Sequence, residues 1–255
     1  VVVVVGYTKD DEGEYIDNEG TAPLIGDLFP SIDHPELGRH APYELPPGHE
    51  PGTFDTPDDD GGRMAPGGDR ASLRLRADDE ALIEAVAARH DRVVVAIQCG
   101  SAVLVPWVDT VSATLMTWYA GVEGGTALAD VLAGAREPAG RLPFAVPTDP
   151  AHLPRFDRSA TSISYDLFHG QWKLDRDGVA PHFPFGWGLG FGAVVVDGAA
   201  TTPDGSIVEV SVTNPGERAT SAVVFVHGGV VDSVHERPPR RLVGFRRVFV
   251  EPGAT

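Results

Sequence analysis

Two uninterrupted apolar runs constrain the fold more than any other feature of this sequence. Val1–Val5 consists of five valines, and Val93–Ile97 reads VVVAI. β-Branched residues favour strands, and a strand that is apolar on both faces is typical of a parallel sheet covered by helices on both sides. We therefore expect both runs to be core strands that lie side by side in one parallel sheet.

Helix and strand patterns alternate around these two runs. Asp78–His90 begins with acidic residues, which suit the positive end of a helix dipole, and Glu123–Ala133 also has helical periodicity. The residues that share an apolar face are Leu82, Ile83, Val86 and Ala87 in the first helix and Ala127, Leu128, Val131 and Leu132 in the second. Ala113–Tyr119 and Leu142–Val146 have the pattern of further strands. This alternation predicts an α/β fold with a largely parallel sheet flanked by helices, an α/β sandwich.

The pattern changes after about Val195. Val208, Val210 and Val212 alternate with polar residues, and Asn214-Pro215-Gly216 has the composition of a turn. Ala222–Val226 and Arg247–Val250 are further strand candidates, and no helical pattern lies between them. The sequence therefore predicts a partial antiparallel β-sandwich of the fibronectin type III-like kind. We expect the first domain to span residues 1–194 and the second residues 195–255.

The first domain contains a long insertion, Asp17–Gly67, that lacks any periodicity. Its 51 residues include nine Pro, eight Gly, eleven acidic and two basic residues, so it carries 9 of the 17 net negative charges of the chain. We expect a long surface excursion with no long helix or strand, because Pro and Gly interrupt both. Segments of this length inside a compact domain are usually functional or disordered.

The charge balance excludes several classes of partner. Lys and Arg number 20 against 37 Asp and Glu, a net charge of −17. Nucleic acids and anionic membranes both require clustered cations, so we expect neither as a partner. No apolar run approaches the roughly 20 residues that span a bilayer. The single cysteine, Cys99, rules out an intrachain disulfide framework.

Glu12 and Glu14 are candidate catalytic residues because they directly follow the first strand. Ligands of open α/β sheets bind outside the carboxyl ends of the strands. A carboxyl group at this place is either a general acid/base with a raised pKa or part of a solvated acidic loop, and position alone leaves both open.

The sequence shows no motif for a metal or a dinucleotide cofactor. His34, His40 and His49 match no metal-ligand spacing, and Gly186–Gly190 neither follows a strand nor opens a helix. We therefore expect no metal and no cofactor.

Several segments in the same order resemble the C-terminal part of glycoside hydrolase family 3, the β-glucosidase and β-xylosidase family. They read VVVVVGYT, EGEYI, GGDRASLRL, ALIEAV, the stretch from RVVVAIQCG to GRLPFAVP, and FHGQWKLDRDGVAPHFPFGWGLGF. The last part, from VEVSVTNPGERATSAVVFVH onward, resembles the fibronectin type III-like module of that family. The resemblance covers the chain outside the insertion.

The resemblance implies a retaining glycosidase that releases a sugar from the non-reducing end through a covalent glycosyl-enzyme. The family's nucleophilic Asp lies in an N-terminal TIM barrel, and its acid/base Glu often lies in a loop reading roughly Ser-Gly-Glu-Gly-Tyr. Here the matching stretch is Glu12-Gly13-Glu14-Tyr15. This match assigns the acid/base to Glu14, with Glu12 as the alternative because the Gly after Glu is absent and Glu replaces the usual Ser. Tyr15 is either a ring that stacks on the sugar or a packing residue.

The resemblance also implies structural roles for two further motifs. Asp69 and Arg70 match the family's DR turn, which we interpret as an Asp–Arg pair that holds the loop. Pro184–Gly188 resembles the family's FPFGHGLSY stretch, and we expect it to pack near the domain junction.

The barrel is absent from this chain, which we expect to be part of a longer protein. The most specific hypothesis is therefore that the chain is part of a β-glucosidase that acts on a β-glucoside or related oligosaccharide. Its partner would be the N-terminal barrel of the parent chain. We expect these 255 residues alone to show little or no turnover. The alternative is a non-catalytic carbohydrate-binding or scaffolding fragment.

Overall fold

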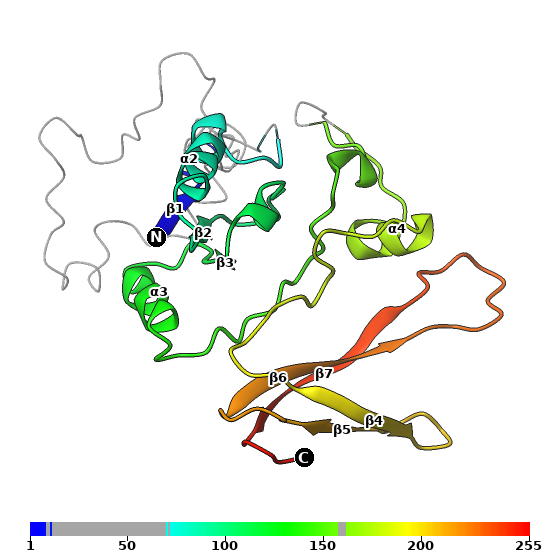
Figure 1. Ribbon diagram of the computed structural model, residues 1–255. Helices are drawn as coiled ribbons and strands as arrows, with labels where there is room; N and C mark the ends of the chain where they lie inside the picture. The colour runs from blue at the N-terminus through cyan, green and yellow to red at the C-terminus, as the bar shows by residue number, and fades with distance from the viewer. Residues whose placement is uncertain (9–10, 12–69, 71, 158–161) are drawn as a thin grey trace, which may run out of the picture. The chain divides into compact units, whose positions relative to one another are not determined.

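The computed structural model describes residues 1–8, 11, 70, 72–157 and 162–255 (Figure 1). The chain forms two compact units, one composed of Val1–Val5 with Leu73–Thr255 and the other of Gly6–Ser72. Nearly all of the predicted insertion, together with Glu12, Glu14 and Tyr15, lies outside the described residues. Almost all of the described residues therefore belong to the first unit, and the predictions from sequence are compared with that unit.

The first unit begins with a three-stranded sheet in the order β1-β2-β3, formed by β1 (Val2–Gly6), β2 (Val94–Gln98) and β3 (Ala113–Met116). β2 and β3 are parallel, with Val95 opposite Thr114. The amide of Val94 donates a hydrogen bond to the carbonyl of Val1 at 2.9 Å, which joins β2 to the start of the chain. The predicted parallel sheet, and the predicted neighbourhood of the two valine-rich runs, are confirmed.

Burial differs between these two strands. Val95 and Ala96 on adjacent positions of β2 are both 0% exposed, so both faces of β2 are covered as predicted. In β1, Val3 and Val5 are buried, but Val2 and Val4 are 45% and 58% exposed. The prediction of two covered faces is therefore wrong for β1. Among the described residues, β1 therefore packs through the face that carries Val3 and Val5, whereas β2, the central strand, is covered on both faces.

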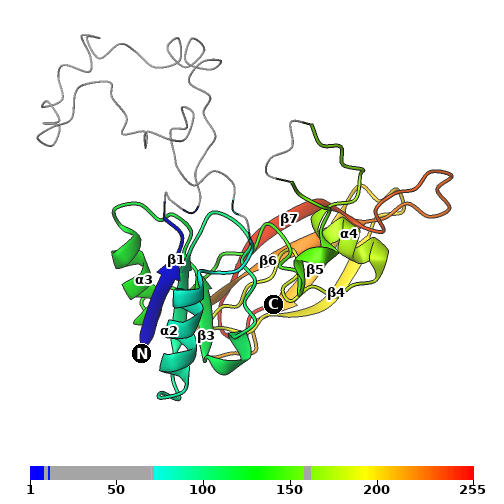
Figure 2. The ribbon, with the colours of Figure 1, turned by 90° about the horizontal axis from the view of Figure 1, so that it is seen from above.

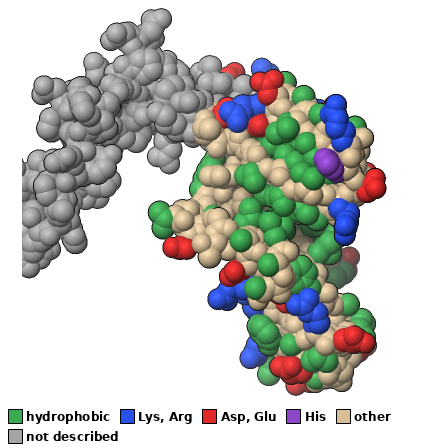
Figure 3. Space-filling view, turned by 60° about the vertical axis from the view of Figure 1, so that its left-hand side comes forward, with side chains coloured by type: hydrophobic (Ala, Val, Ile, Leu, Met, Phe, Trp, Pro, Cys, Tyr) green, Lys and Arg blue, Asp and Glu red, His purple; other side chains and the backbone are tan. Residues whose placement is uncertain are grey.

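The two predicted helices are present but pack less completely than their sequences suggest. α2 (Ala77–Ala87) buries Ile83 fully, while Leu82 is 47% exposed. α3 (Gly124–Leu132) has no buried residue, and Leu132 is 41% exposed. Figure 3 shows hydrophobic side chains gathered in the centre of one face of the described part, with charged side chains around them. Amphipathic periodicity thus identified both helices but overstated how much of each apolar stripe is buried.

Two strand predictions need correction. Leu142–Val146 is not a strand, because Val146 forms only an isolated antiparallel bridge with Phe183. Pro143 and Pro147 lack amide hydrogens, so the segment cannot continue a ladder of hydrogen bonds. β3 ends at Met116 instead of Tyr119. Trp118 has a positive φ of 57°, which takes the chain out of the extended conformation two residues later.

Four strands follow: β4 (Val195–Thr201), β5 (Val208–Thr213), β6 (Thr220–Gly228) and β7 (Arg241–Val250). They form two antiparallel pairs, β4-β5 and β6-β7, and Figures 1 and 2 both show the four strands lying together. The predicted antiparallel part is therefore confirmed, although the division at residues 194 and 195 stays a prediction.

The predicted turn at Asn214 is held by the buried side chain of this residue. Asn214 is 0% exposed, and its Nδ2 donates to the carbonyls of Arg218 and Val250 at 2.7 and 2.9 Å. Its Oδ1 accepts from the Gly216 amide at 2.9 Å. One polar side chain thus satisfies three backbone groups at the ends of β5, β6 and β7.

Glu137 joins the four-stranded part to the rest of the first unit. Its carboxylate accepts hydrogen bonds from the amides of Phe191, Gly192 and Ser221 at 3.1, 3.2 and 2.9 Å, and from the hydroxyl of Thr220. Partial burial alone would raise the pKa of Glu137, but these four hydrogen bonds outweigh it and lower the pKa below its usual value.

The Pro184–Gly188 stretch packs at the same junction. The Phe185 ring contacts the Phe225 ring of β6, with centroids 5.7 Å apart. The Gly186 amide donates to the carbonyl of Leu142 at 2.8 Å. The structure thus agrees with the structural role predicted for this stretch.

Glu137→Gln is expected to lower the free energy of unfolding by about 1–2 kcal/mol at pH 7, because hydrogen bonds to a charged acceptor are replaced by weaker ones. The pKa of Glu137 is lowered in the folded state, so its contribution is present above the unfolded-state pKa of about 4.3 and is lost as pH falls through the folded-state value. Urea unfolding at pH 7 and pH 3 should show the difference between wild type and variant shrink at pH 3. Glu209→Gln, at an exposed position of β5, is the control. A difference that persists unchanged at pH 3 would contradict this interpretation.

Candidate functional site

The predicted catalytic residues Glu12 and Glu14 and the predicted substrate-binding Tyr15 lie outside the described residues. The same is true of the three histidines His34, His40 and His49 and of Asp69. The structure therefore does not test their roles. It does describe the residues at the two ends of the segment that contains them.

Tyr7 and Arg70 meet at the base of this segment. The Tyr7 side chain is 6% exposed, and the Arg70 guanidinium lies over its ring at 4.5 Å from the centroid. A cation over an aromatic face is attracted by the ring quadrupole. Because residues 7 and 70 are in contact, the chain between them leaves and returns at one place. The predicted excursion itself, Asp17–Gly67, lies outside the described residues and stays a prediction.

A tight turn follows Tyr7. The Asp11 carboxylate accepts hydrogen bonds from the amide and the hydroxyl of Thr8 at 2.9 and 3.0 Å, and the Asp11 amide donates to the Thr8 carbonyl at 3.0 Å. Aspartate commonly closes turns in this way. The turn therefore redirects the chain one residue before Glu12.

The first unit contains a cavity of about 910 Å³, which we call the α4 cavity. It is bordered by Ser101 and Ala102, which come shortly after the carboxyl end of β2, and by residues of α4 (Gly170–Asp177). Its walls include the side chains of Phe144, Tyr165, Trp172, Phe185, His227 and Arg240. The volume lies within the range of about 300–1,000 Å³ that is usual for small-molecule sites.

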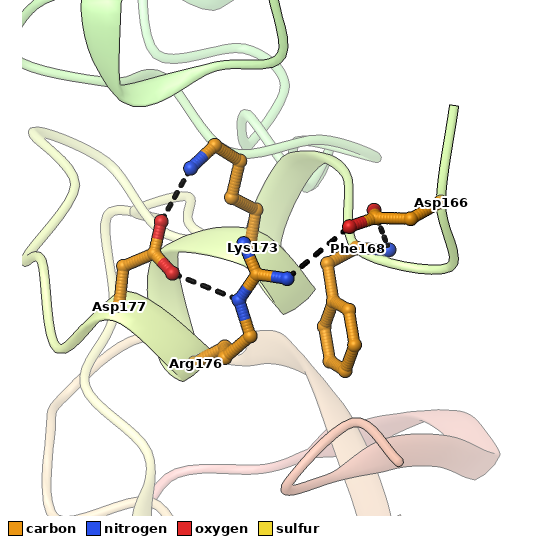
Figure 4. A network of polar contacts seen from close by, with 5 residues as sticks. All are labelled: Asp166, Phe168, Lys173, Arg176 and Asp177. Atoms are coloured by element: carbon orange, nitrogen blue, oxygen red, sulfur yellow. Dashed lines mark hydrogen bonds and ion pairs between the residues drawn. The ribbon is translucent and has the colours of Figure 1, made fainter. Parts of the chain in front are cut away.

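α4 is held in place by a network of charged side chains (Figure 4). Arg176 donates to Asp177 at 2.8 Å and to Asp166 at 3.3 Å, and its guanidinium lies over the Phe168 ring at 4.4 Å. Asp166 also accepts from the Phe168 amide at 2.7 Å, and Lys173 pairs with Asp177. The network connects the helix to the segment that precedes it.

A second set of contacts ties α4 to the start of β7. Arg240 donates two hydrogen bonds to Asp175, at 2.8 and 3.0 Å, and Gln171 donates to the same carboxylate at 2.7 Å. The hydrogen bond from Arg240 lowers the pKa of Asp175, so this carboxyl is ionised near neutral pH. The oxygen of Gln171 accepts from the Phe185 amide at 3.0 Å. The polar groups of this wall are therefore largely bonded to one another.

Sequence reasoning missed α4 and the cavity. Two signals in the sequence could have indicated the helix. Gln171 with Asp175, and Lys173 with Asp177, are pairs spaced four residues apart, which is the spacing of neighbours on one helix face. Gly178 then ends the helix at a positive φ of 67°. The cavity itself has no local signal, because its walls come from segments up to 169 residues apart, from Leu73 to Leu242.

Within the described residues, no helix is long and apolar enough to cross a membrane. The same residues contain no group of three or more His, Cys, Asp or Glu that could hold a metal ion.

Residues 1–191 match the family described as glycosyl hydrolase family 3 C-terminal domain. The chain belongs to glycosyl hydrolase family 3. The family 3 match includes Glu12, Glu14 and Tyr15, and it ends close to the start of β4.

Curated family 3 relatives are β-glucosidases. A β-glucosidase of Rhizobium radiobacter is 40% identical over 202 residues, which cover 73% of this chain and 25% of the relative. Thermostable beta-glucosidase B of Acetivibrio thermocellus is 36% identical over 199 residues, covering 73% of this chain and 26% of the relative. The chain thus spans about a quarter of the length of these relatives.

Solved family 3 structures have the same fold over most of this chain. The β-glucosidase of Bifidobacterium adolescentis aligns with a TM-score of 0.68 at 31% identity, covering 74% of this chain and 30% of that chain. β-Glucosidase 3B of Thermotoga neapolitana, solved in complex with glucose, aligns with a TM-score of 0.65 at 28% identity, covering 72% and 28%. The predicted α/β sandwich followed by antiparallel strands is therefore the family 3 C-terminal fold.

Proposed function

We propose that this chain is the C-terminal part of a retaining β-glucosidase and supplies the acid/base residue Glu14 to a TIM barrel elsewhere in the parent protein. The observation that carries the proposal is the family 3 match over residues 1–191, because it includes the loop after β1. The proposed substrate is a β-glucoside or related oligosaccharide. The proposed partner is the parent's barrel domain, which would provide the nucleophilic carboxylate and most contacts to the sugar.

The proposed chemistry needs two carboxyl groups in different protonation states. Retaining glycosidases place them about 5–5.5 Å apart, one as nucleophile and one as acid/base. Glu14 would protonate the glycosidic oxygen as the bond to the aglycone breaks and the nucleophile attacks the anomeric carbon. It would then remove a proton from the water that hydrolyses the glycosyl-enzyme.

The surroundings of Glu14 in the sequence favour a raised pKa. Asp10, Asp11 and Glu12 lie within four residues, and an ionised nucleophile in the barrel would add a further negative charge. Nearby like charges disfavour ionisation and keep a carboxyl protonated at higher pH. Glu12 remains the alternative acid/base, and Tyr15 would flank the bound sugar.

Proton NMR of the parent enzyme acting on a β-glucoside tests the proposed stereochemistry. We expect β-glucose to form first and to convert to the α-anomer only by slow mutarotation, because two displacements restore the configuration. We expect the 255-residue chain alone to release no glucose under the same conditions. α-Glucose as the first product would contradict a retaining mechanism, and an inactive parent enzyme would favour the alternative of a non-catalytic carbohydrate-binding protein.

A further inference from the structure

We propose that the α4 cavity binds a planar aromatic molecule, such as the phenolic aglycone of a glucoside. The cavity lies within the first unit and uses neither Glu12 nor Glu14. Binding there would be a property of this chain by itself and therefore goes beyond the proposed hydrolysis.

The walls of the cavity favour an aromatic ligand by their shape and composition. Phe144, Tyr165, Trp172 and Phe185 line the cavity and come from three different segments of the chain. Tyr165 is 49% exposed, so its ring is accessible to a ligand. Aromatic rings gain favourable stacking or edge-to-face contacts with one another in addition to the area that they bury.

The hydrogen bonding of the wall disfavours a sugar as the ligand. The carboxylate of Asp175 already accepts from Arg240 and Gln171, and the oxygen of Gln171 accepts from the Phe185 amide. At this part of the wall, a sugar would have to remove hydroxyl groups from water without gaining Asp175 or Gln171 as free partners, which costs free energy. A flat molecule with one or two oxygen atoms loses far less hydration.

The charge at the rim suits the oxygen atom of a phenol. Arg240 and Arg241 both border the cavity, and among the residues that the structure describes no carboxylate pairs with Arg241. An oxygen acceptor, and a phenolate above all, would accept hydrogen bonds from guanidinium groups. Arg240 is already paired with Asp175, so Arg241 is the cation at the rim that favours a ligand with an acidic hydroxyl group over an uncharged apolar molecule.

Calorimetric titration of the 255-residue chain with 4-nitrophenol tests the proposal, with cellobiose as the comparison ligand. We expect saturable binding of one 4-nitrophenol per chain and no binding of cellobiose over the same concentration range. Tyr165→Ala should weaken 4-nitrophenol binding by about fivefold or more, because one ring contact is lost. Ile163→Ala is the matched control, since Ile163 is 46% exposed two residues away and does not border the cavity.

Three results would overturn the proposal: no saturable binding of 4-nitrophenol, equal affinity in Tyr165→Ala and wild type, or tighter binding of cellobiose. Thermal unfolding of both variants should match wild type, because both positions are exposed, and this checks that lost binding is not lost folding. Binding to the isolated chain does not depend on Glu14. The cavity proposal can therefore fail while the proposed glycosidase function holds, and the glycosidase function can fail while the cavity still binds 4-nitrophenol.

Discussion

Glu14→Ala in the parent enzyme is expected to slow hydrolysis of glucosides with poor leaving groups by about 10²–10⁴-fold, because their departure needs protonation. Aryl glucosides with good leaving groups should still form the glycosyl-enzyme at a nearly normal rate and then stall, since no base activates water. Azide needs no base, so it should restore turnover and give β-glucosyl azide. Steady-state kinetics on both substrate classes, with and without azide, measures these effects.

Glu12→Ala is the internal control for this assignment. We expect a milder loss of activity and no azide rescue, because the family resemblance assigns the acid/base to Glu14. Rescue in Glu12→Ala but not in Glu14→Ala would move the assignment by two residues. Rescue in neither variant would place the acid/base outside this loop.

Val3→Asp is expected to lower the free energy of unfolding by about 3 kcal/mol or more, the largest stability effect that we expect. Val3 is 5% exposed in β1, so the substitution places a carboxyl group without a partner against the core. Urea unfolding followed by circular dichroism measures the loss of stability. If the variant does not fold, the same spectra show the absence of secondary structure without urea.

Val4→Asp provides a closely matched control on the same strand. Val4 is 58% exposed, so the same change of side chain should cost less than about 1 kcal/mol. Equal losses at the two positions would mean that the outer face of β1 is also covered in solution. A loss below about 1 kcal/mol at Val3 would place β1 at the margin of the core.

For the catalytic site, the sequence supplied local motifs alone. The family match includes Glu12, Glu14 and Tyr15, and their roles stay predictions because these residues lie outside the described ones. The contact between Tyr7 and Arg70 lies beyond the reach of local motifs, because it joins residues 63 positions apart in the sequence. The α4 cavity is a stronger case, since its ring-bearing walls come from segments that share no periodicity.

The elements of the fold were largely determined by the sequence. Five consecutive valines and the VVVAI run specify strands because β-branched side chains suit a pleated surface. Apolar residues at helical spacing specify α2 and α3, and alternation specifies β5. These are properties of a residue and its near neighbours, which the sequence contains in full.

Tertiary structure alone decided which apolar residues are buried and where strands end. Val2 and Val95 belong to equally apolar runs, yet Val2 is 45% exposed and Val95 is 0% exposed, because among the described residues both faces of β2 are covered and only one face of β1 is. Val146 has strand propensity but gains a single bridge, since a partner must align with it and prolines flank its segment. Burial and pairing depend on what a second segment brings to the same place, and that information is distributed over the whole chain.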